Sequence, residues 1–168
     1  MLSENIETYK FILAKEEKDF QNAKKLFRQY AKSLNFDLCF QNFENEIKNI
    51  QTQYNLPTGR LILVLDKNNR AIGCVGIRKF ENKIAELKRM YLKKNYRNQN
   101  LGKKLLQLAL DEAKNLGYKK IRLDTIATME AAIHLYRKTG FKEIPSYRHN
   151  PIEDVKYFEY ELGRNNRS

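Results

Sequence analysis

The amino-acid sequence predicts an α/β fold in which one mixed β-sheet carries helices on both faces. Strand-like and helix-like apolar patterns follow each other along the chain in the order β-α-α-β-β-β-α-β-α-β-β. The 168 residues are enough for one hydrophobic core, and no repeat, linker or low-complexity tract divides them. Because a sheet and its helices bury their apolar faces against each other, we expect a single domain spanning residues 1–168.

The N-terminal part is expected to form one strand and two helices. Residues 8–13, TYKFIL, have the composition of a strand. Asp19 can open a helix whose apolar residues recur at helical spacing up to Leu34. Residues 43–50 predict a second, short helix. The aromatic connection between the two helices is interpreted either as a seal over the core or as the wall of a substrate pocket.

A loop and a hairpin are expected next. Residues 54–59, YNLPTG, contain the Pro and Gly that are typical of a loop. Residues 60–66 and 71–80 are rich in β-forming side chains, and the polar residues 67–70 separate them. This pattern predicts a β-hairpin.

The centre of the chain predicts a strand, a basic turn and a helix. Residues 84–92 form a mostly apolar run of strand length, and residues 93–100 are polar and basic. Leucine and alanine then recur at helical spacing over residues 101–116, and Gly117 marks the end of that helix. The free N–H groups at the start of such a helix favour anions, so the turn is either a phosphate site or a solvated linker.

The C-terminal part is expected to close the sheet. Residues 119–125 predict a strand, and residues 128–139 predict a helix that ends at Gly140. Residues 141–144 and 155–162 predict two closing strands around a loop. The last five residues are expected to be frayed.

Composition narrows the function classes. The net charge of +12 fits nucleic-acid binding, a polyanionic cofactor or a lysine-rich surface. The basic residues are spread along the whole chain, which argues against a nucleic-acid partner. No apolar run approaches membrane-spanning length, and the N-terminus lacks a signal-peptide core. Cys39 and Cys74 are expected to be buried free thiols of a cytoplasmic protein, and the two histidines form no metal-ligand cluster.

The basic turn resembles a known phosphate-binding motif. Residues 97–102, Arg-Asn-Gln-Asn-Leu-Gly, resemble the R/Q-x-x-G-x-G/A signature of the GCN5-related N-acetyltransferases (GNAT), in which this turn binds the pyrophosphate of acetyl-CoA. Asn100 replaces the first glycine, and Asn98 lies where many members have another. After glycine, asparagine is the residue that best tolerates left-handed backbone angles, so the turn can keep its shape.

A second segment resembles the same family. Residues 131–141, AAIHLYRKTGF, contain a stretch similar to its A-x-x-L-Y-x-x-x-G-F pattern, and the order of expected elements matches the family along nearly the whole chain. The resemblance implies the acyl-CoA N-acyltransferase fold, with a mostly antiparallel sheet. It also implies acetyl transfer to a primary amine, of a small molecule or a peptide, by direct attack in a ternary complex. The alternative is a binding module that keeps the acyl-CoA site and has lost catalysis.

Two residues are the catalytic candidates that the resemblance implies. Tyr136 lies where family members carry the tyrosine that protonates the departing thiolate, and a phenol suits that role; the competing interpretation is a tyrosine packed under the sheet. Glu86 lies in an apolar strand where some members carry the glutamate that accepts the amine proton. We expect it to be half-buried, and an ion pair with Lys88 or Arg89 is the competing interpretation.

The resemblance also implies the residues that hold acetyl-CoA. Backbone groups of Met90 and Leu92 are expected to pair with the pantetheine arm, and one of their N–H groups is the expected oxyanion donor. Many members have an asparagine where this chain has Met129, so Thr128 can take over that contact or the contact is absent. The full set of cofactor-binding candidates is Met90, Tyr91, Leu92, Arg97, Asn98, Gln99, Asn100, Leu101, Gly102, Lys103, Thr128, Ala132 and Tyr136.

The acceptor site is predicted only by location. Its walls should come from the connection between the first two helices and from the loop between the last strands, which gives Phe40, Gln41, Tyr147, Arg148 and Asn150 as candidates. No cysteine lies in either motif, so an acetyl-cysteine route has no visible nucleophile. We expect acetyl-CoA and an amine as partners, no metal, no membrane, and a monomer or homodimer.

Overall fold

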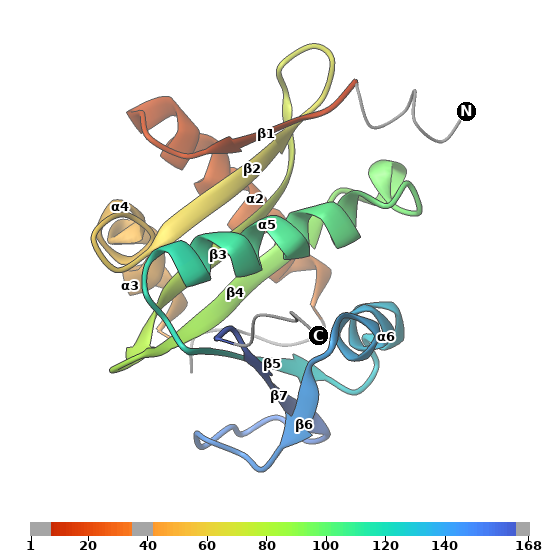
Figure 1. The fold of residues 1–168 in the computed structure, drawn as a ribbon. Coiled ribbons are helices and arrows are strands. Elements are labelled where there is room, and N and C mark those ends of the chain that lie inside the picture. Colours follow the sequence, from red (N-terminus) through yellow and green to blue (C-terminus); the bar gives the residue numbers. More distant parts are fainter. Residues whose placement is uncertain (1–7, 35–41, 164–168) are drawn as a thin grey trace, which may run out of the picture.

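The fold is organised around a seven-stranded β-sheet (Figure 1). The structure, a computed structural model, describes residues 8–34 and 42–163. The strand order is β1-β2-β3-β4-β5-β7-β6, and neighbouring strands are antiparallel except for the parallel pair β4 and β5. The strands are β1 (Lys10–Leu13), β2 (Arg60–Leu65), β3 (Ala71–Glu81), β4 (Ile84–Leu92), β5 (Lys120–Ile126), β6 (Lys142–Ile144) and β7 (Val155–Glu161).

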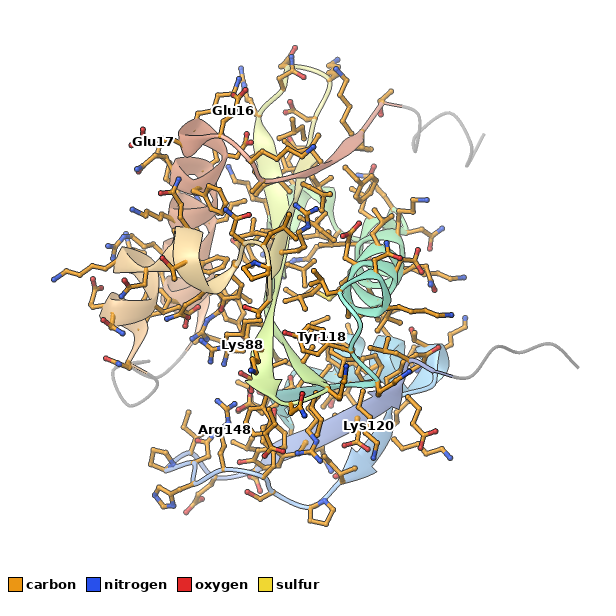
Figure 2. All side chains as sticks on the ribbon, turned by 60° about the vertical axis from the view of Figure 1, so that its left-hand side comes forward. Glu16, Glu17, Lys88, Tyr118, Lys120 and Arg148 are labelled. Atoms are coloured by element: carbon orange, nitrogen blue, oxygen red, sulfur yellow. The ribbon has the colours of Figure 1, made fainter. Side chains whose placement is uncertain are left out.

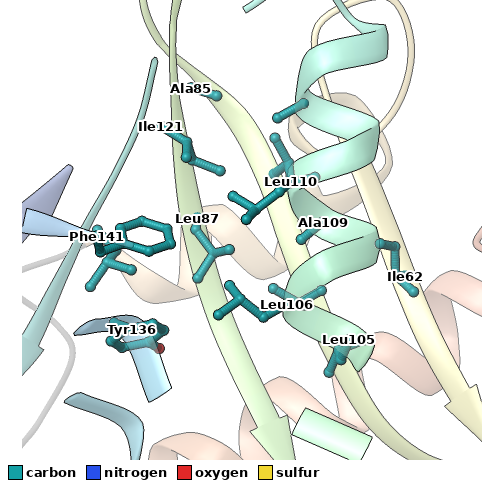
Figure 3. Close-up of a cluster of buried hydrophobic side chains, with 14 of the residues drawn as sticks. Ile62, Ala85, Leu87, Leu105, Leu106, Ala109, Leu110, Ile121, Tyr136 and Phe141 are labelled. Carbon is teal, nitrogen blue, oxygen red and sulfur yellow. The ribbon is translucent and has the colours of Figure 1, made fainter. Parts of the chain in front are cut away.

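Helices cover both faces of this sheet. On one face, α5 and α6 pack with Leu87, Ile121 and the ring of Phe158 in one buried cluster (Figure 3). On the other face, α2, α3 and α4 pack against Leu61 and Cys74 in a second cluster. No helix within the described residues is long and apolar enough to cross a membrane. The helices are α2 (Glu17–Ser33), α3 (Phe43–Lys48), α4 (Ile50–Gln53), the short 3₁₀-helix η2 (Lys94–Tyr96), α5 (Leu101–Asn115) and α6 (Glu130–Thr139).

This architecture confirms the predicted fold class and order of elements. Strand β4 has the predicted bounds, and α5 begins at Leu101 as expected. Gly117 and Gly140 follow the ends of α5 and α6 with φ angles of +93° and +118°, a conformation that glycine adopts without steric cost. The expected frayed tail lies outside the described residues.

The predicted second helix is broken in two. Asn49, between α3 and α4, has φ −107° and ψ 23°. Its side-chain amide donates a hydrogen bond to the carbonyl of Asn45 at 2.9 Å, and an asparagine that bonds the backbone in this way competes with helix propagation. The helical pattern of the sequence contains no sign of this side-chain bond.

Strands β4 and β5 are paired over only part of their lengths. Their parallel ladder ends at the pair Glu86–Arg122, although β4 continues to Leu92 and β5 to Ile126. A bulge in β4, where Arg89 has a φ angle of +57°, shifts the register against β3 and increases the local bend. Beyond this last rung, residues 88–92 and 124–126 form no further ladder pair across this boundary within the described residues. We call these facing, unpaired stretches the wedge.

Candidate active site

The basic turn, residues 93–100, leads from the end of the wedge into α5. Asn98 and Asn100 have φ angles of +65° and +61°, so both asparagines occupy the left-handed conformation that the sequence predicted they could adopt. The first i to i−4 bond of α5 runs from the Lys104 N–H to the Asn100 carbonyl at 3.2 Å, and the N–H groups that precede it, from Leu101 to Lys103, are left without an intrahelical partner. The first turn of α5 contains no acidic side chain. It is therefore suited to an anion.

Contacts from outside the turn fix its shape. The Tyr9 hydroxyl donates a hydrogen bond to Gln99 Oε1 at 2.9 Å, and the ring of Tyr9 packs edge-on against Tyr96. Arg97 folds back on the strand: its Nε donates to the Leu92 carbonyl at 2.9 Å, and its guanidinium lies 5.9 Å from the centre of the Tyr91 ring. The role of Tyr9 was not predicted, because it depends on β1 lying beside the turn in three dimensions.

Gly102 joins the basic turn to the wedge. A Cβ atom placed on Gly102 would lie 3.7 Å from side-chain atoms of Met90, Leu92 and Leu135, which is an ordinary contact distance. The protein itself would therefore accept alanine at this position. A requirement for glycine would have to come from a ligand that approaches the backbone.

The backbone of β4 presents free groups to the wedge. The Lys93 N–H donates to the Ile72 carbonyl of β3 at 2.9 Å, so by strand alternation the N–H groups of Leu92 and Met90 point away from β3. The hydrogen bond from Arg97 Nε to the Leu92 carbonyl independently shows that the backbone groups of Leu92 point away from β3. Because β5 does not pair with this part of β4, these groups can bond to an extended ligand as an added strand would.

Tyr136 lies beside the wedge on the face covered by α5 and α6. Its side chain is 6% exposed, it packs with the rings of Phe141 and Phe158, and its hydroxyl is 4.0 Å from Met90 Sδ. In Figure 3, Leu87 separates Tyr136 and Phe141 from the leucines of α5. Burial raises the pKa of Tyr136, so the phenol remains protonated and can donate a hydrogen bond or a proton. The packing interpretation is thus confirmed, and the role of Tyr136 in protonating the departing thiolate stays a prediction.

Glu86 lies on the opposite face of β4 and differs from expectation in two respects. It is 1% exposed rather than half-buried. Its ion-pair partners are Arg78, at 3.1 Å, and Arg148, rather than Lys88 or Arg89. Arg78 is its cross-strand neighbour on β3, so the hairpin register brings these charges together. Tyr147 donates a third interaction to Glu86 Oε2 at 3.1 Å, so donors engage both carboxylate oxygens.

The candidates from the loop before β7 have different surroundings. Tyr147 and Arg148 contact Glu86 and therefore lie close to the wedge. Asn150 uses its side-chain oxygen to accept a hydrogen bond from the Ile152 N–H at 3.0 Å, which shapes the loop. Phe40 and Gln41, like Cys39, lie outside the described residues.

The residues around the start of α6 also differ from one another. Thr128 is exposed in the turn before the helix, and Ala132 is half-buried against the α5–α6 cluster. Met129, which stands in place of the family's asparagine, accepts a hydrogen bond from Thr125 Oγ1 at 3.7 Å. Met129 therefore packs locally, and the structure gives it no polar group to offer a cofactor.

Two charged residues beside Glu86 were not predicted. Lys88 is 3% exposed, and burial, followed by the charge of Arg89, lowers its pKa to about 7. Asp124, on β5, has a buried Oδ2 that lacks a hydrogen-bond partner among the described residues and lies 3.9 Å from Arg148 Nε. Figure 2 shows Lys88 and Arg148 on the side of the sheet away from α5. We call the group of Glu86, Lys88, Asp124, Tyr147 and Arg148 the polar cluster.

A buried network holds the β4 bulge next to the polar cluster. Arg89 donates to both oxygens of Glu46 on α3, at 2.8 and 3.0 Å, and the Tyr54 hydroxyl donates to Glu46 at 2.8 Å. The Cys74 thiol donates to the Arg89 carbonyl at 3.3 Å. Burial raises the pKa of Cys74, which makes it an inert core thiol, in agreement with the sequence prediction. The described residues contain no cluster of three or more side chains that could hold a metal ion.

Comparison with known proteins agrees with this geometry. The family model described as the Acetyltransferase (GNAT) family matches residues 22–141, which include the basic turn, the wedge and Tyr136. The chain belongs to the GNAT family. It is 33% identical to an uncharacterized N-acetyltransferase of Schizosaccharomyces pombe over 147 residues, a match that covers 87% of this chain and 90% of the relative.

Solved structures show the same fold. An acetyltransferase of the GNAT family from Staphylococcus aureus superposes with a TM-score of 0.76 at 23% identity, over 92% of this chain and 99% of that one. PaiA N-acetyltransferase from Thermoplasma acidophilum, solved in complex with coenzyme A, superposes with a TM-score of 0.66 at 19% identity, over 90% and 99% of the two chains. At these identities the similarity establishes the fold, and the site must be argued from this chain's own residues.

Proposed function

We propose that this GNAT protein is an acetyl-CoA-dependent N-acetyltransferase that acts on a primary amine by direct attack in a ternary complex. The observation that carries the proposal is the continuity of the site. The wedge runs from the anion-binding start of α5 to a point where Tyr136 lies on one face and the polar cluster on the other. We further propose that one domain, residues 1–168, carries this activity in the cytoplasm, as a monomer or homodimer.

The residues present fit an acyl-CoA. Free N–H groups at residues 101–103, without acidic neighbours, suit the pyrophosphate, with Asn98, Gln99 and Lys103 around them. The Met90 and Leu92 backbone suits the amide groups of the pantetheine arm, and an N–H there suits the oxyanion. Coenzyme A bound to PaiA supports an acyl-CoA as the ligand class. When bound, acetyl-CoA supplies the thioester whose acetyl group is transferred.

Tyr136 is proposed as the proton donor. The neutral amine attacks the thioester carbonyl, a C–N bond forms, and the C–S bond breaks. The departing thiolate then takes the Tyr136 proton, and the phenol recovers one as the nitrogen loses its second hydrogen. The products are the amide, the thiol and the one proton that the ammonium form released beforehand. Because burial raises its pKa, Tyr136 is protonated at neutral pH and ready to donate.

Glu86 was the sequence candidate for the base, and its surroundings support an organising role better. Two guanidinium groups and one hydroxyl occupy its carboxylate oxygens. To accept a proton from the amine, Glu86 would first have to give up some of these bonds. As an anchor, by contrast, Glu86 already ties the loop that carries Tyr147 and Arg148 to the wedge.

The test is a turnover assay that measures thiol release from acetyl-CoA with amines, amino acids and peptides as acceptors. The proposal expects thiol release that depends on both the acceptor and the enzyme, with the acetylated amine as product. Binding of acetyl-CoA without transfer to any acceptor would favour the non-catalytic binding module instead. An acetylated enzyme that forms without an acceptor would contradict direct attack.

A further inference from the structure

The polar cluster contains a cation, Lys88, and an anion, Asp124, that lie on the same face of the sheet on opposite sides of the wedge. Glu86 and Arg122 form the last rung of the β4–β5 ladder. By strand alternation, Lys88 and Asp124 each lie two residues further on, on the same face as that rung. The strands begin to separate at this point, so Lys88 and Asp124 flank the narrow end of the wedge.

Within the described residues, the other charges on this face have close partners, whereas Lys88 has none and Asp124 has only a distant one. The ammonium group of Lys88 makes no hydrogen bond or ion pair with residues 8–34 and 42–163, and within them the only ion-pair contact of Asp124 is the 3.9 Å approach of Arg148 Nε. The paired groups are Arg89 with Glu46, Arg78 and Arg148 with Glu86, and Arg122 with Glu159.

Leaving a buried ammonium without an acceptor is costly, and here nearby charges raise the cost. Burial lowers the pKa of Lys88, Arg89 and Arg78 lower it further, and Asp124 and Glu46 act in the opposite direction. Lys88 and Asp124 influence each other electrostatically but are farther apart than the 4.0 Å of an ion pair. A ligand with both charges could therefore lie between them and satisfy both.

We propose that Lys88 and Asp124 bind a zwitterionic acceptor, an α-amino acid, with its carboxylate on Lys88 and its ammonium group on Asp124. This inference rests on the proposed acetyl transfer and names its substrate class. Asp124 receives the proton that the ammonium group loses, and the resulting neutral amine lies at the narrow end of the wedge, where the thioester would be. A peptide N-terminus has an amide in place of the carboxylate and would leave Lys88 without a counter-ion.

The first experiment compares matched acceptors on the wild-type protein. Thiol release from acetyl-CoA is measured with each of the twenty amino acids, with its α-amide and with the amine that lacks the α-carboxyl group. We expect kcat/KM for the best amino acid to exceed that of its amide and its decarboxylated amine by at least tenfold. Equal or faster reaction of the amides, the decarboxylated amines or peptides would overturn the proposal while leaving acetyl transfer intact.

Variants then test which group of the amino acid each of the two charged residues binds. Lys88→Met should raise KM for the amino acid at least tenfold, with little change in kcat and no change in KM for the decarboxylated amine. Asp124→Asn should raise KM for both acceptors, because both carry the ammonium group. Lys79→Met, the same substitution at an exposed site on β3, is the matched control and should change neither. A loss of kcat in Lys88→Met that is equal for all amines would contradict the carboxylate-binding role.

A binding measurement separates failure of this inference from failure of the proposed function. Amino acids are titrated by calorimetry into the protein saturated with coenzyme A, in which no transfer can occur. We expect binding that Lys88→Met and Asp124→Asn each weaken at least tenfold. If no amine is acetylated but amino acids bind in this way, the proposed function fails and the zwitterion site stands. If no amino acid binds, the site is overturned.

Discussion

The basic turn and the polar cluster differ in how much of their organisation is local in the sequence. The basic turn and the start of α5 are formed by one continuous stretch, and two asparagines with φ angles near +60° define the turn. The polar cluster brings together β4, β5 and the loop before β7, and its contacts span more than sixty residues in the case of Glu86 and Arg148. A short motif could therefore predict the cofactor side, whereas the acceptor side depends on tertiary contacts.

Because the basic turn is formed by one continuous stretch, a substitution there should abolish ligand binding without unfolding the protein. Gly102→Val should weaken acetyl-CoA binding at least 100-fold, about 2.7 kcal/mol, because a branched side chain occupies the approach to the α5 N–H groups. Gly102→Ala is the matched control, since its Cβ makes only ordinary contacts within the protein. Calorimetry gives the affinity and thermal unfolding checks the fold. Tight binding by Gly102→Val would place the phosphate elsewhere.

Tyr136→Phe should slow the chemical step without weakening the binding of acetyl-CoA. Loss of a general acid lowers kcat about 100-fold, while acetyl-CoA affinity should be nearly unchanged because the ring packing remains. Single-turnover kinetics with a saturating acceptor measures this step. If kcat is unchanged, Tyr136 is only a packing residue.

Glu86→Gln, a substitution in the polar cluster, should lower the stability of the protein. Removing the charge leaves Arg78 and Arg148 without their shared carboxylate, and we expect a loss of about 3 kcal/mol in the free energy of unfolding. Urea denaturation measures it. The pH–rate profile of the variant should keep its shape, and a flattened acidic limb would instead restore Glu86 as the base that the family resemblance implies.

Lys88→Met should stabilise the protein by about 2 kcal/mol at neutral pH, because it replaces a buried charge that has no partner among the described residues with an apolar side chain of similar length. In the native state the pKa of Lys88 is lowered to about 7 from its ordinary 10.5. Above pH 7 the native state therefore binds fewer protons than the unfolded state, and wild-type stability rises relative to the variant. Denaturation from pH 6 to 10 should show the gap closing. A variant less stable than wild type would argue against a lysine retained for binding.

The smallest expected effect is the contribution of Glu46 to the pH dependence of protein stability. Burial raises its pKa, but the hydrogen bonds and charge of Arg89 outweigh burial, so the pKa is lowered from its ordinary 4.5. The stability contributed by ionised Glu46 is thus present above the unfolded-state pKa and is lost as pH falls through the native pKa. Glu46→Gln should flatten the decline of stability at acid pH. An equal decline in both proteins would assign it to other carboxylates.

The sequence predicted most of the fold because its elements follow local rules. Apolar periodicity placed β4 and α5, and glycines marked the ends of α5 and α6. The break at Asn49 was missed, because it depends on one side-chain hydrogen bond rather than on periodicity.

The site was predicted less evenly. The basic turn could be predicted because asparagine tolerates the required backbone angles. The partners of Glu86 could not, since Arg78 meets it through hairpin register and Arg148 through a distant loop. The sequence contained one usable signal for Lys88 and Asp124. Each lies two residues beyond a charged residue of its strand, Glu86 or Arg122, so once the parallel pairing of these two residues is known, both side chains are expected on the same face of the sheet.

Amide hydrogen exchange, measured with and without acetyl-CoA, tests most directly whether the wedge and the start of α5 form one ligand site. The account predicts that acetyl-CoA slows exchange at the N–H groups of Met90, Leu92 and Gly102 together, while the paired strands β2 and β7 change little. Binding that protects none of these groups, or protects only residues outside the wedge and the basic turn, would contradict it.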